Sequence, residues 1–172
     1  MIILETPRLL LRRYTLEDVD ALSEVICDHE NMRFFPKRFE REDAVEWIEK
    51  NLRRYAEEGV GGWALIVKDR NARGEFGGYC GLAYREVDGA RELEVGYALA
   101  RHCQGRGIAT EGARACMDYA FQTLGVERVI SLIRAENTPS RRVAERNGMV
   151  VEKETQWAEQ PHLVYVAGRP VS

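Results

Sequence analysis

Residues 104–110 read Gln-Gly-Arg-Gly-Ile-Ala-Thr, and their types suit the binding of an anion. Gly105 and Gly107 allow the backbone to come close to a ligand, because glycine has no side chain. A helix is expected over 108–124, and the first turn of a helix carries unpaired N–H groups with partial positive charge. The segment therefore fits a pyrophosphate, although a glycine-rich turn that only reverses the chain would use the same residues. The residue types alone leave both interpretations open.

Two common phosphate-binding motifs do not fit this segment. A Walker loop requires Gly-Lys followed by Ser or Thr, and the chain has no such triplet. A dinucleotide fingerprint requires a third glycine where Thr110 stands, and an acidic residue at the end of the next strand. Glu127 has nearly the right separation, but it precedes the strand expected at 129–134. NAD binding is therefore disfavoured.

The elements that must position this loop follow from hydrophobic periodicity. Apolar residues at spacings of three and four predict helices over 16–27, 41–57 and 108–124. A fourth helix is expected to begin at Thr138-Pro139 and to end at Asn147-Gly148. The packing residues expected for the helix at 41–57 are Ala44, Trp47, Ile48, Leu52 and Tyr55. The expected strands cover 8–14, 63–68, 74–86, 91–100, 129–134, 149–154 and 163–167.

The order of these elements predicts the fold class. Asp88-Gly89 has the chemistry of a hairpin turn, so the three strands between 63 and 100 should pair antiparallel. The helix at 108–124 then connects strand 91–100 to strand 129–134, and such a crossover favours parallel pairing. We predict an α/β (α+β) protein with a mixed, mostly antiparallel sheet of six or seven strands and about four helices on its faces.

Length and composition limit the class of protein. The 172 residues suit one domain, expected to span 1–172, and a net charge of −3 argues against direct binding of nucleic acid. The apolar N-terminus lacks the long core of a secretion signal, and no apolar run is long enough for a membrane span. The four cysteines form no Cys-x-x-Cys pair, and the three histidines lack ligand spacing. We expect free thiols in a reducing cytoplasm, and no metal.

The loop also matches the pattern Gln/Arg-x-x-Gly-x-Gly/Ala at Gln104, Gly107 and Ala109. This pattern is the acetyl-CoA pyrophosphate motif of the GNAT superfamily of N-acetyltransferases, which the chain resembles over nearly its whole length. Further blocks, in the family's order, resemble the Rim-type branch that acetylates ribosomal-protein N-termini. They are Leu4-Glu5-Thr6-Pro7-Arg8-Leu9 with Leu11-Arg12, Glu94-Val95-Gly96-Tyr97, Ala109-Thr110-Glu111, Asn137-x-x-Ser140 and Asn147-Gly148-Met149.

The resemblance implies a GNAT fold in which acetyl-CoA, as cosubstrate, lies between two splayed parallel strands at the sheet's centre, here 92–99 and 129–134. Backbone near 98–100 is expected to pair with the pantetheine arm, and amides of 105–110 to hold the pyrophosphate. Asn137 should contact the pantetheine region and Ser140 the thiol end. Gly96 would leave room for the cofactor, unless a β-bulge explains it. The implied cofactor-binding residues are Ala98, Leu99, Ala100, Gln104, Gly105, Arg106, Gly107, Ile108, Ala109, Thr110, Asn137 and Ser140.

The chemistry would be acetyl transfer to an amine, which must lose a proton to attack. Many relatives carry a tyrosine where this chain has Ala144, and some carry a glutamate where it has Leu132. Glu94 is then the remaining candidate base, the alternative being an ordinary carboxylate on the polar face of a strand. Glu111 suits the positive end of its helix and is interpreted as structural. Cys103 lacks an activating partner, so covalent catalysis is not expected.

The acceptor site of this fold would lie near residues 29–39, Trp47 and 157–162. The aromatic stretch 31–36 could line it or could pack as an ordinary loop. Glu154 and Glu159 could attract a cationic amine, or could simply be solvated. The implied function is acetyl transfer from acetyl-CoA to a primary amine, either a protein N-terminus or a small molecule, by direct attack in a ternary complex. A non-catalytic, acyl-CoA-binding regulatory domain is the alternative, and a monomer or a homodimer would be compatible with the sequence.

Overall fold

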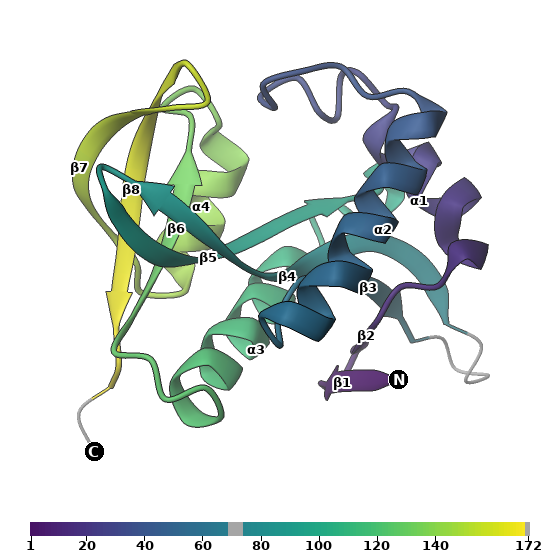
Figure 1. The fold of residues 1–172 in the computed structure, drawn as a ribbon, viewed down its shortest axis with the longest axis horizontal. Helices are drawn as coiled ribbons and strands as arrows, with labels where there is room; N and C mark the ends of the chain where they lie inside the picture. Colours follow the sequence, from purple (N-terminus) through teal and green to yellow (C-terminus); the bar gives the residue numbers. More distant parts are fainter. Residues whose placement is uncertain (69–73, 171–172) are drawn as a thin grey trace.

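A computed structural model describes residues 1–68 and 74–170 of the chain. Its strands are β1 (Ile2–Glu5), β2 (Leu9–Arg12), β3 (Gly62–Val67), β4 (Glu75–Val87), β5 (Ala90–Leu99), β6 (Arg128–Ile133), β7 (Val150–Trp157) and β8 (Gln160–Gly168). They form one mixed sheet in the order β1-β2-β3-β4-β5-β6-β8-β7. Figure 1 shows β6, β8 and β7 at one side of the molecule and β1 to β3 at the other, with β4 and β5 between them.

Four α-helices surround this sheet in the described part of the chain. α1 (Val19–Ile26) and α2 (Arg41–Glu57) pack against each other. α3 (Ile108–Gln122) packs on β4 and β5 and also contacts α4 (Thr138–Arg146). Short 3₁₀ turns cover Leu16–Asp18 and Arg101–Cys103, so the helix expected over 16–27 begins as a tighter turn. The predicted fold class is confirmed.

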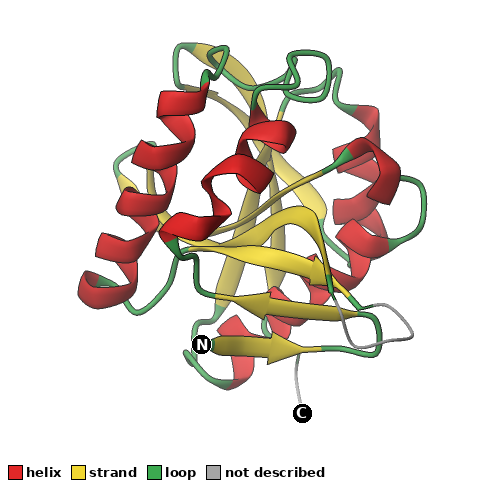
Figure 2. Ribbon diagram, turned by 90° about the vertical axis from the view of Figure 1, so that its right-hand side faces the viewer, coloured by secondary structure: helices red, strands yellow, loops and turns green. Residues whose placement is uncertain are grey.

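The sheet has eight strands, whereas the sequence predicts six or seven. The additional strand is β1, which pairs antiparallel with β2 from Ile2 opposite Arg12 to Glu5 opposite Leu10. Figure 2 shows this N-terminal strand along the edge of the sheet. Four residues are too few to display a clear alternation, and its partner is what makes this segment a strand.

The buried face of α2 differs from the expected one at one position. Leu52 is 38% exposed, whereas its neighbour Asn51 is buried. The Asn51 Oδ1 accepts a hydrogen bond from the Gly62 N–H at 2.7 Å, and its Nδ2 donates to the Trp47 carbonyl at 2.8 Å. A buried amide needs such partners. Asn51 therefore ties α2 to the start of β3, a role that hydrophobic periodicity does not predict.

The central strands β5 and β6 are parallel, and they are in register at one pair of residues, Glu94 opposite Ile130. β5 stays paired with β4 from Ala90 to Leu99, so it is β6 that leaves the ladder. Just beyond the pair, the Ser131 hydroxyl donates to the Val95 carbonyl at 3.1 Å. The predicted splayed parallel pair is confirmed, and it leaves one edge of β5 open along its last residues.

A glycine on β4 allows β4 to approach the end of β5 closely. Gly78 has a φ of +133°, and a Cβ built there would lie 2.2 Å from the Ala98 carbonyl oxygen and 2.8 Å from the Leu99 Cα. We expect Gly78→Ala to lower the free energy of unfolding in urea by roughly 2–4 kcal/mol, because it adds backbone overlap to an unfavourable φ. Gly89→Ala is the control, because its φ of +80° is unfavourable but its Cβ meets nothing within 4 Å. Equal losses in the two variants would contradict this account.

Candidate functional site

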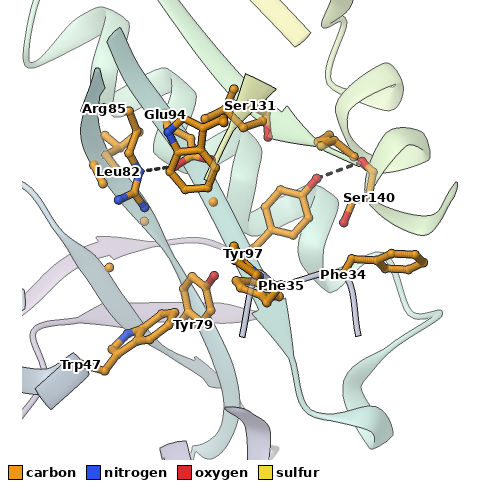
Figure 3. Close-up of a pocket in the computed structure, with 18 of the residues that line it drawn as sticks. Phe34, Phe35, Trp47, Tyr79, Leu82, Arg85, Glu94, Tyr97, Ser131 and Ser140 are labelled. Atoms are coloured by element: carbon orange, nitrogen blue, oxygen red, sulfur yellow. Dashed lines mark hydrogen bonds and ion pairs between the residues drawn. The ribbon is translucent and has the colours of Figure 1, made fainter. Parts of the chain in front are cut away.

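A cavity of about 360 Å³ opens where β5 and β6 separate. α2, the end of the preceding loop, β4, β5, β6 and the β7–β8 hairpin contribute to its wall. Figure 3 shows Trp47 and Tyr79 toward one side of it and Ser140 toward the other, with Tyr97 between them. The aromatic lining residues are Phe34, Phe35, Phe39, Trp47, Tyr79, Tyr97 and Trp157.

Glu94 of β5 lies in this wall as half of an ion pair. Its Oε2 is 2.7 Å from the Nε of Arg85 on β4, and the two side chains are 12% and 27% exposed. Figure 3 shows the pair beside the cavity. Burial opposes the charge on Arg85, but the Glu94 carboxylate outweighs it and raises the pKa of Arg85. The pair therefore holds a carboxylate in a fixed orientation at the point where the strands part.

The hydroxyl of Tyr97 points to the start of α4, where it donates to the Ser140 carbonyl at 3.0 Å. Asn137 caps the same helix, because its Oδ1 accepts from the Ser140 N–H at 3.3 Å. Burial raises the pKa of Tyr97, so this phenol keeps its proton at neutral pH. The sequence does not single out the Tyr97 side chain as a site residue, because strand alternation puts Tyr97 on one face with apolar residues such as Val95 and Leu99. The structure brings Glu94, Tyr97, Asn137 and Ser140 to one cavity.

Gly96 is part of a regular ladder. It pairs with Gly81, and the register runs unshifted from Val95 opposite Leu82 to Tyr97 opposite Cys80. The β-bulge interpretation of Gly96 is therefore wrong. A Cβ at Gly96 would meet nothing within 4 Å, so the open space beside it is a volume that a ligand could fill.

The open edge of β5 presents alternate residues. The Ala100 N–H donates to the Gly77 carbonyl at 2.9 Å, so this amide belongs to the sheet. Because neighbouring residues of a strand direct their amides to opposite sides, Ala98 also faces β4, whereas Tyr97 and Leu99 face the gap. The three residues expected to pair with a pantetheine arm are Ala98, Leu99 and Ala100. The backbone of Ala98 and Ala100 faces β4 instead, and of the three only Leu99 faces the gap.

The Leu99 carbonyl is already taken by two side chains. It accepts from the Asn31 Nδ2 at 2.9 Å and from the Gln104 Nε2 at 3.1 Å. The Gln104 amide also donates to Asn31 Oδ1. Gln104 therefore fixes the loop to β5, and what remains for a ligand on this edge is the Leu99 N–H together with the backbone of Tyr97.

The expected pyrophosphate loop ends at the N-terminus of α3. Gly105 and Gly107 have φ values of +70° and +74°, and Gly107 is the N-cap. Within the described residues, no backbone N–H from 105 to 110 has a hydrogen-bond acceptor, and the buried Thr110 hydroxyl has none either. A row of unpaired donors at the end of a helix of 15 residues fits an anion such as pyrophosphate.

The loop is braced by the N-terminal segment of the chain. Glu111 Oε1 accepts from the Thr6 hydroxyl at 2.6 Å and from the Arg8 N–H at 3.1 Å, and its Oε2 accepts from Arg8 Nε at 2.5 Å. Arg8 Nη1 in turn donates to the Arg106 carbonyl at 2.8 Å. Glu111 is structural, as expected, through these contacts as well as through the helix dipole.

Only part of the expected acceptor site lines the cavity. Trp47, Trp157 and His162 line the cavity, as do the aromatic residues of 34–39. His29 lies outside it, and so do the predicted amine-attracting residues Glu154 and Glu159 on the β7–β8 hairpin. Across 1–68 and 74–170, no cluster of three possible metal ligands is present. No helix in these residues is long and apolar enough to cross a membrane.

Cys103 is fully buried, and burial raises the pKa of its thiol. A thiol held in its protonated form is a poor nucleophile. The structure therefore agrees with the sequence in giving Cys103 no part in covalent chemistry.

Comparison with known proteins adds to this geometry. The sequence matches the acetyltransferase (GNAT) domain family over residues 8–150. It is 30% identical over 145 residues to a protein named uncharacterized N-acetyltransferase YnaD from Bacillus subtilis, which covers 84% of this chain and 80% of that one. The fold is similar to a GNAT-family acetyltransferase from Bacillus anthracis, with a TM-score of 0.80, 26% identity, and coverage of 98% and 99% of the two chains. It is also similar to RimL, a ribosomal alpha-N-protein acetyltransferase in complex with coenzyme A, with a TM-score of 0.75, 20% identity and 98% coverage of each chain.

The brace around Glu111 predicts a pH dependence of stability. Burial alone would raise the pKa of Glu111, but the hydrogen bonds from Thr6 and Arg8 outweigh it and lower this pKa. At pH 7, Glu111→Gln should reduce the free energy of unfolding by about 1–3 kcal/mol, the usual effect of losing charged hydrogen bonds. A carboxyl whose folded pKa is lowered stabilises above its unfolded value of 4.5 and loses this effect as the pH falls through the folded pKa.

The difference between wild type and Glu111→Gln should therefore shrink as urea unfolding is repeated below about pH 4.5. Glu49→Gln on the exposed face of α2 is the control, with a small effect at each pH. A difference for Glu111→Gln that stays constant with pH would show that its charge does not hold the brace.

Proposed function

Since the chain belongs to the acetyltransferase (GNAT) family, we propose that it transfers an acetyl group from acetyl-CoA to a primary amine by direct attack in a ternary complex. It is an acetyl-CoA-dependent N-acetyltransferase, with RimL among its structural neighbours. The observation that carries the proposal is the position of two features at the gap between β5 and β6. Unpaired helix amides lie at one end of it, and a carboxylate-bearing cavity lies at the other.

The grip on acetyl-CoA is assigned to backbone more than to side chains. The amides of 105–110 would hold the pyrophosphate, since they have no other acceptor among the described residues. The open space at Gly96 and the gap-facing backbone of Tyr97 and Leu99 would receive the pantetheine arm. The thioester would supply an activated acetyl group at the point where the strands part, and Glu94 lines the cavity there.

Glu94 is proposed as the base that removes the proton of the attacking amine, directly or through a water molecule. Its ion pair with Arg85 uses Oε2, and Oε1 makes no hydrogen bond with any described residue. One oxygen is therefore oriented by Arg85 and the other is available at the cavity wall. An amine bound in this cavity would lie close to the gap, so its proton would have a short path to the carboxylate.

The departing thiolate meets the start of α4. Ala144, where relatives carry an acid, is buried, so that position contributes no proton. The Ser140 hydroxyl and the phenol of Tyr97 are the protic groups that line the cavity there. A thiol with a pKa near 8.5 is also a fair leaving group without help, so the loss of the tyrosine at 144 does not prevent turnover.

The acceptor is proposed to be a protein N-terminus or a small-molecule amine, in a reducing cytoplasm that suits the four free cysteines. The competing candidate is a regulatory domain that binds acyl-CoA without turnover. The absence of a tyrosine at 144 favours it, whereas the placement of Glu94 in the cavity favours an enzyme. Release of free thiol from acetyl-CoA across a panel of amines separates the two.

Binding of coenzyme A should stabilise the fold, by about 2.7 kcal/mol at 100 times its dissociation constant. Gly107→Val should remove most of this gain, because a branched side chain would block the amides at the N-terminus of α3. The control is Gly125→Val at the other end of α3, where φ is +70° and a Cβ meets nothing within 4 Å. Thermal unfolding with and without coenzyme A measures the stabilisation of the wild type and of both variants. If coenzyme A does not stabilise the wild type, the cofactor assignment is wrong.

Removal of the proposed base should slow turnover without weakening cofactor binding. Glu94→Gln keeps a partner for Arg85 but loses the basicity, so kcat should fall by about 10²–10⁴. A higher pH should partly restore the rate, because more of the amine then arrives neutral. The control is Glu92→Gln on the same strand, which breaks a comparable ion pair with Arg128 outside the cavity. Equal pH–rate profiles for Glu94→Gln and wild type would return Glu94 to a structural role.

A further inference from the structure

We infer that the amine acceptor carries an anionic group, a carboxylate, which Arg54 and Lys50 of α2 bind at the far wall of the cavity. This inference rests on the proposed function and names the substrate class of that site.

Arg54 is a largely buried cation without a hydrogen bond. Its side chain is 18% exposed, and its nearest acid is Glu58, with Nε and Oε2 4.0 Å apart. Glu58 is itself shared with Arg91, whose Nη2 lies 3.3 Å from Oε1. The Arg54 guanidinium donates to no residue in the described chain, although it has five donors to satisfy. The donors of this guanidinium are therefore available to an anionic ligand in the cavity.

Lys50 lies one helical turn before Arg54 and lines the same cavity. It has no acid within 4.0 Å among the described residues. Lys50 is an exposed residue, and its partial burial, followed by the charges of Arg54 and Arg85, lowers its pKa. Burial, followed by the charge of Arg85, lowers the pKa of Arg54. The two side chains therefore share an electropositive region that a bound anion would relieve.

The acids of the cavity do not cancel this charge. Asp43 is paired with Lys37, and Glu94 is paired with Arg85. Glu46 is exposed, one turn before Lys50, and stays more than 4.0 Å from any cation of the described chain. The wall formed by Lys50 and Arg54 thus carries positive charge that is met only by the long contact of Arg54 with Glu58 at 4.0 Å. Aromatic side chains line the same cavity.

Coenzyme A is not the source of the missing anion. Its phosphates are assigned to residues 105–110, none of which lines the cavity. Arg54 lines the same cavity as the Arg85–Glu94 pair, so an amine held at Glu94 would have its carboxylate directed to the wall that carries Arg54. A compact amino acid with an aromatic side chain fits this arrangement, and so does a peptide whose first residue is acidic.

The test compares acids with their amides on wild type and variants. Phenylalanine is compared with phenylalaninamide, and a peptide that begins with Asp with the same peptide beginning with Asn. The amide also changes the basicity of the amine, so the decisive quantity is how a variant changes the ratio of the two KM values. Arg54→Met should raise KM for the acid about 10- to 100-fold and leave the amide nearly unchanged. Lys50→Met should act in the same direction with a smaller effect.

Arg53→Met is the matched control, because Arg53 is an exposed cation on α2 outside the cavity. A second arm needs no turnover: binding of N-acetylphenylalanine and of its amide to the enzyme loaded with coenzyme A, measured by calorimetry. The acid should bind more tightly than the amide, and Arg54→Met should abolish the difference. A preference for the acid that Arg54→Met removes, in either the amino acid pair or the peptide pair, supports the inference and identifies the source of the carboxylate.

The two proposals fail in different ways. Acetylation of acids and amides with equal response to Arg54→Met, together with equal binding of the two products, overturns the anion site and leaves the acetyltransferase intact. Absence of thiol release with any amine counts against the proposed function, while the binding arm still decides whether Arg54 recognises a carboxylate. If the variant Arg54→Met does not fold, Lys50→Met carries the same comparison.

Discussion

The single parallel pairing between Glu94 and Ile130 is the constraint on which the site depends. Two strands that share one pairing and then diverge leave backbone groups without partners, and this is normally unfavourable inside a protein. Part of the cost is met locally, since Ser131 satisfies the Val95 carbonyl and two amide side chains satisfy that of Leu99. The groups that remain open lie between a helix N-terminus and an acidic side chain, so the unsatisfied edge is also the one that we propose binds acetyl-CoA.

Packing elsewhere in the molecule keeps this gap from closing. β4 follows β5 along its whole length, and Gly78 lets it do so at the point where β5 ends. The N-terminal turn holds the start of α3 through Thr6, Arg8 and Glu111. These contacts join segments that are more than 100 residues apart in the sequence. The loop before α3, which is proposed to hold the pyrophosphate, is therefore positioned by the fold as a whole.

Much of this could be read from the sequence, for identifiable reasons. The helices and the crossover were predictable because periodicity and the Asn147-Gly148 cap are local signals. β1 was not, because a four-residue edge strand depends on its partner. The loop at 104–110 and Glu94 were predictable as a motif and a candidate base, but Tyr97 was not, since strand alternation assigns it to the core and only the splay turns it toward α4. Asn51 and Arg54 could not be predicted either, because their roles depend on residues in other elements of the fold.

The carbonyl oxygen of Leu99 connects two loops of the candidate site. It accepts one hydrogen bond from Asn31, in the loop that supplies aromatic residues to the cavity wall. It accepts a second from Gln104, in the loop that would hold the pyrophosphate. The ion pair of Asp28 with Arg101 joins the same two loops a second time. Immobilising either loop therefore reduces the entropy that remains to be lost in the other. We expect the two substrates to bind with positive heterotropic linkage, each raising the affinity of the other by the same factor.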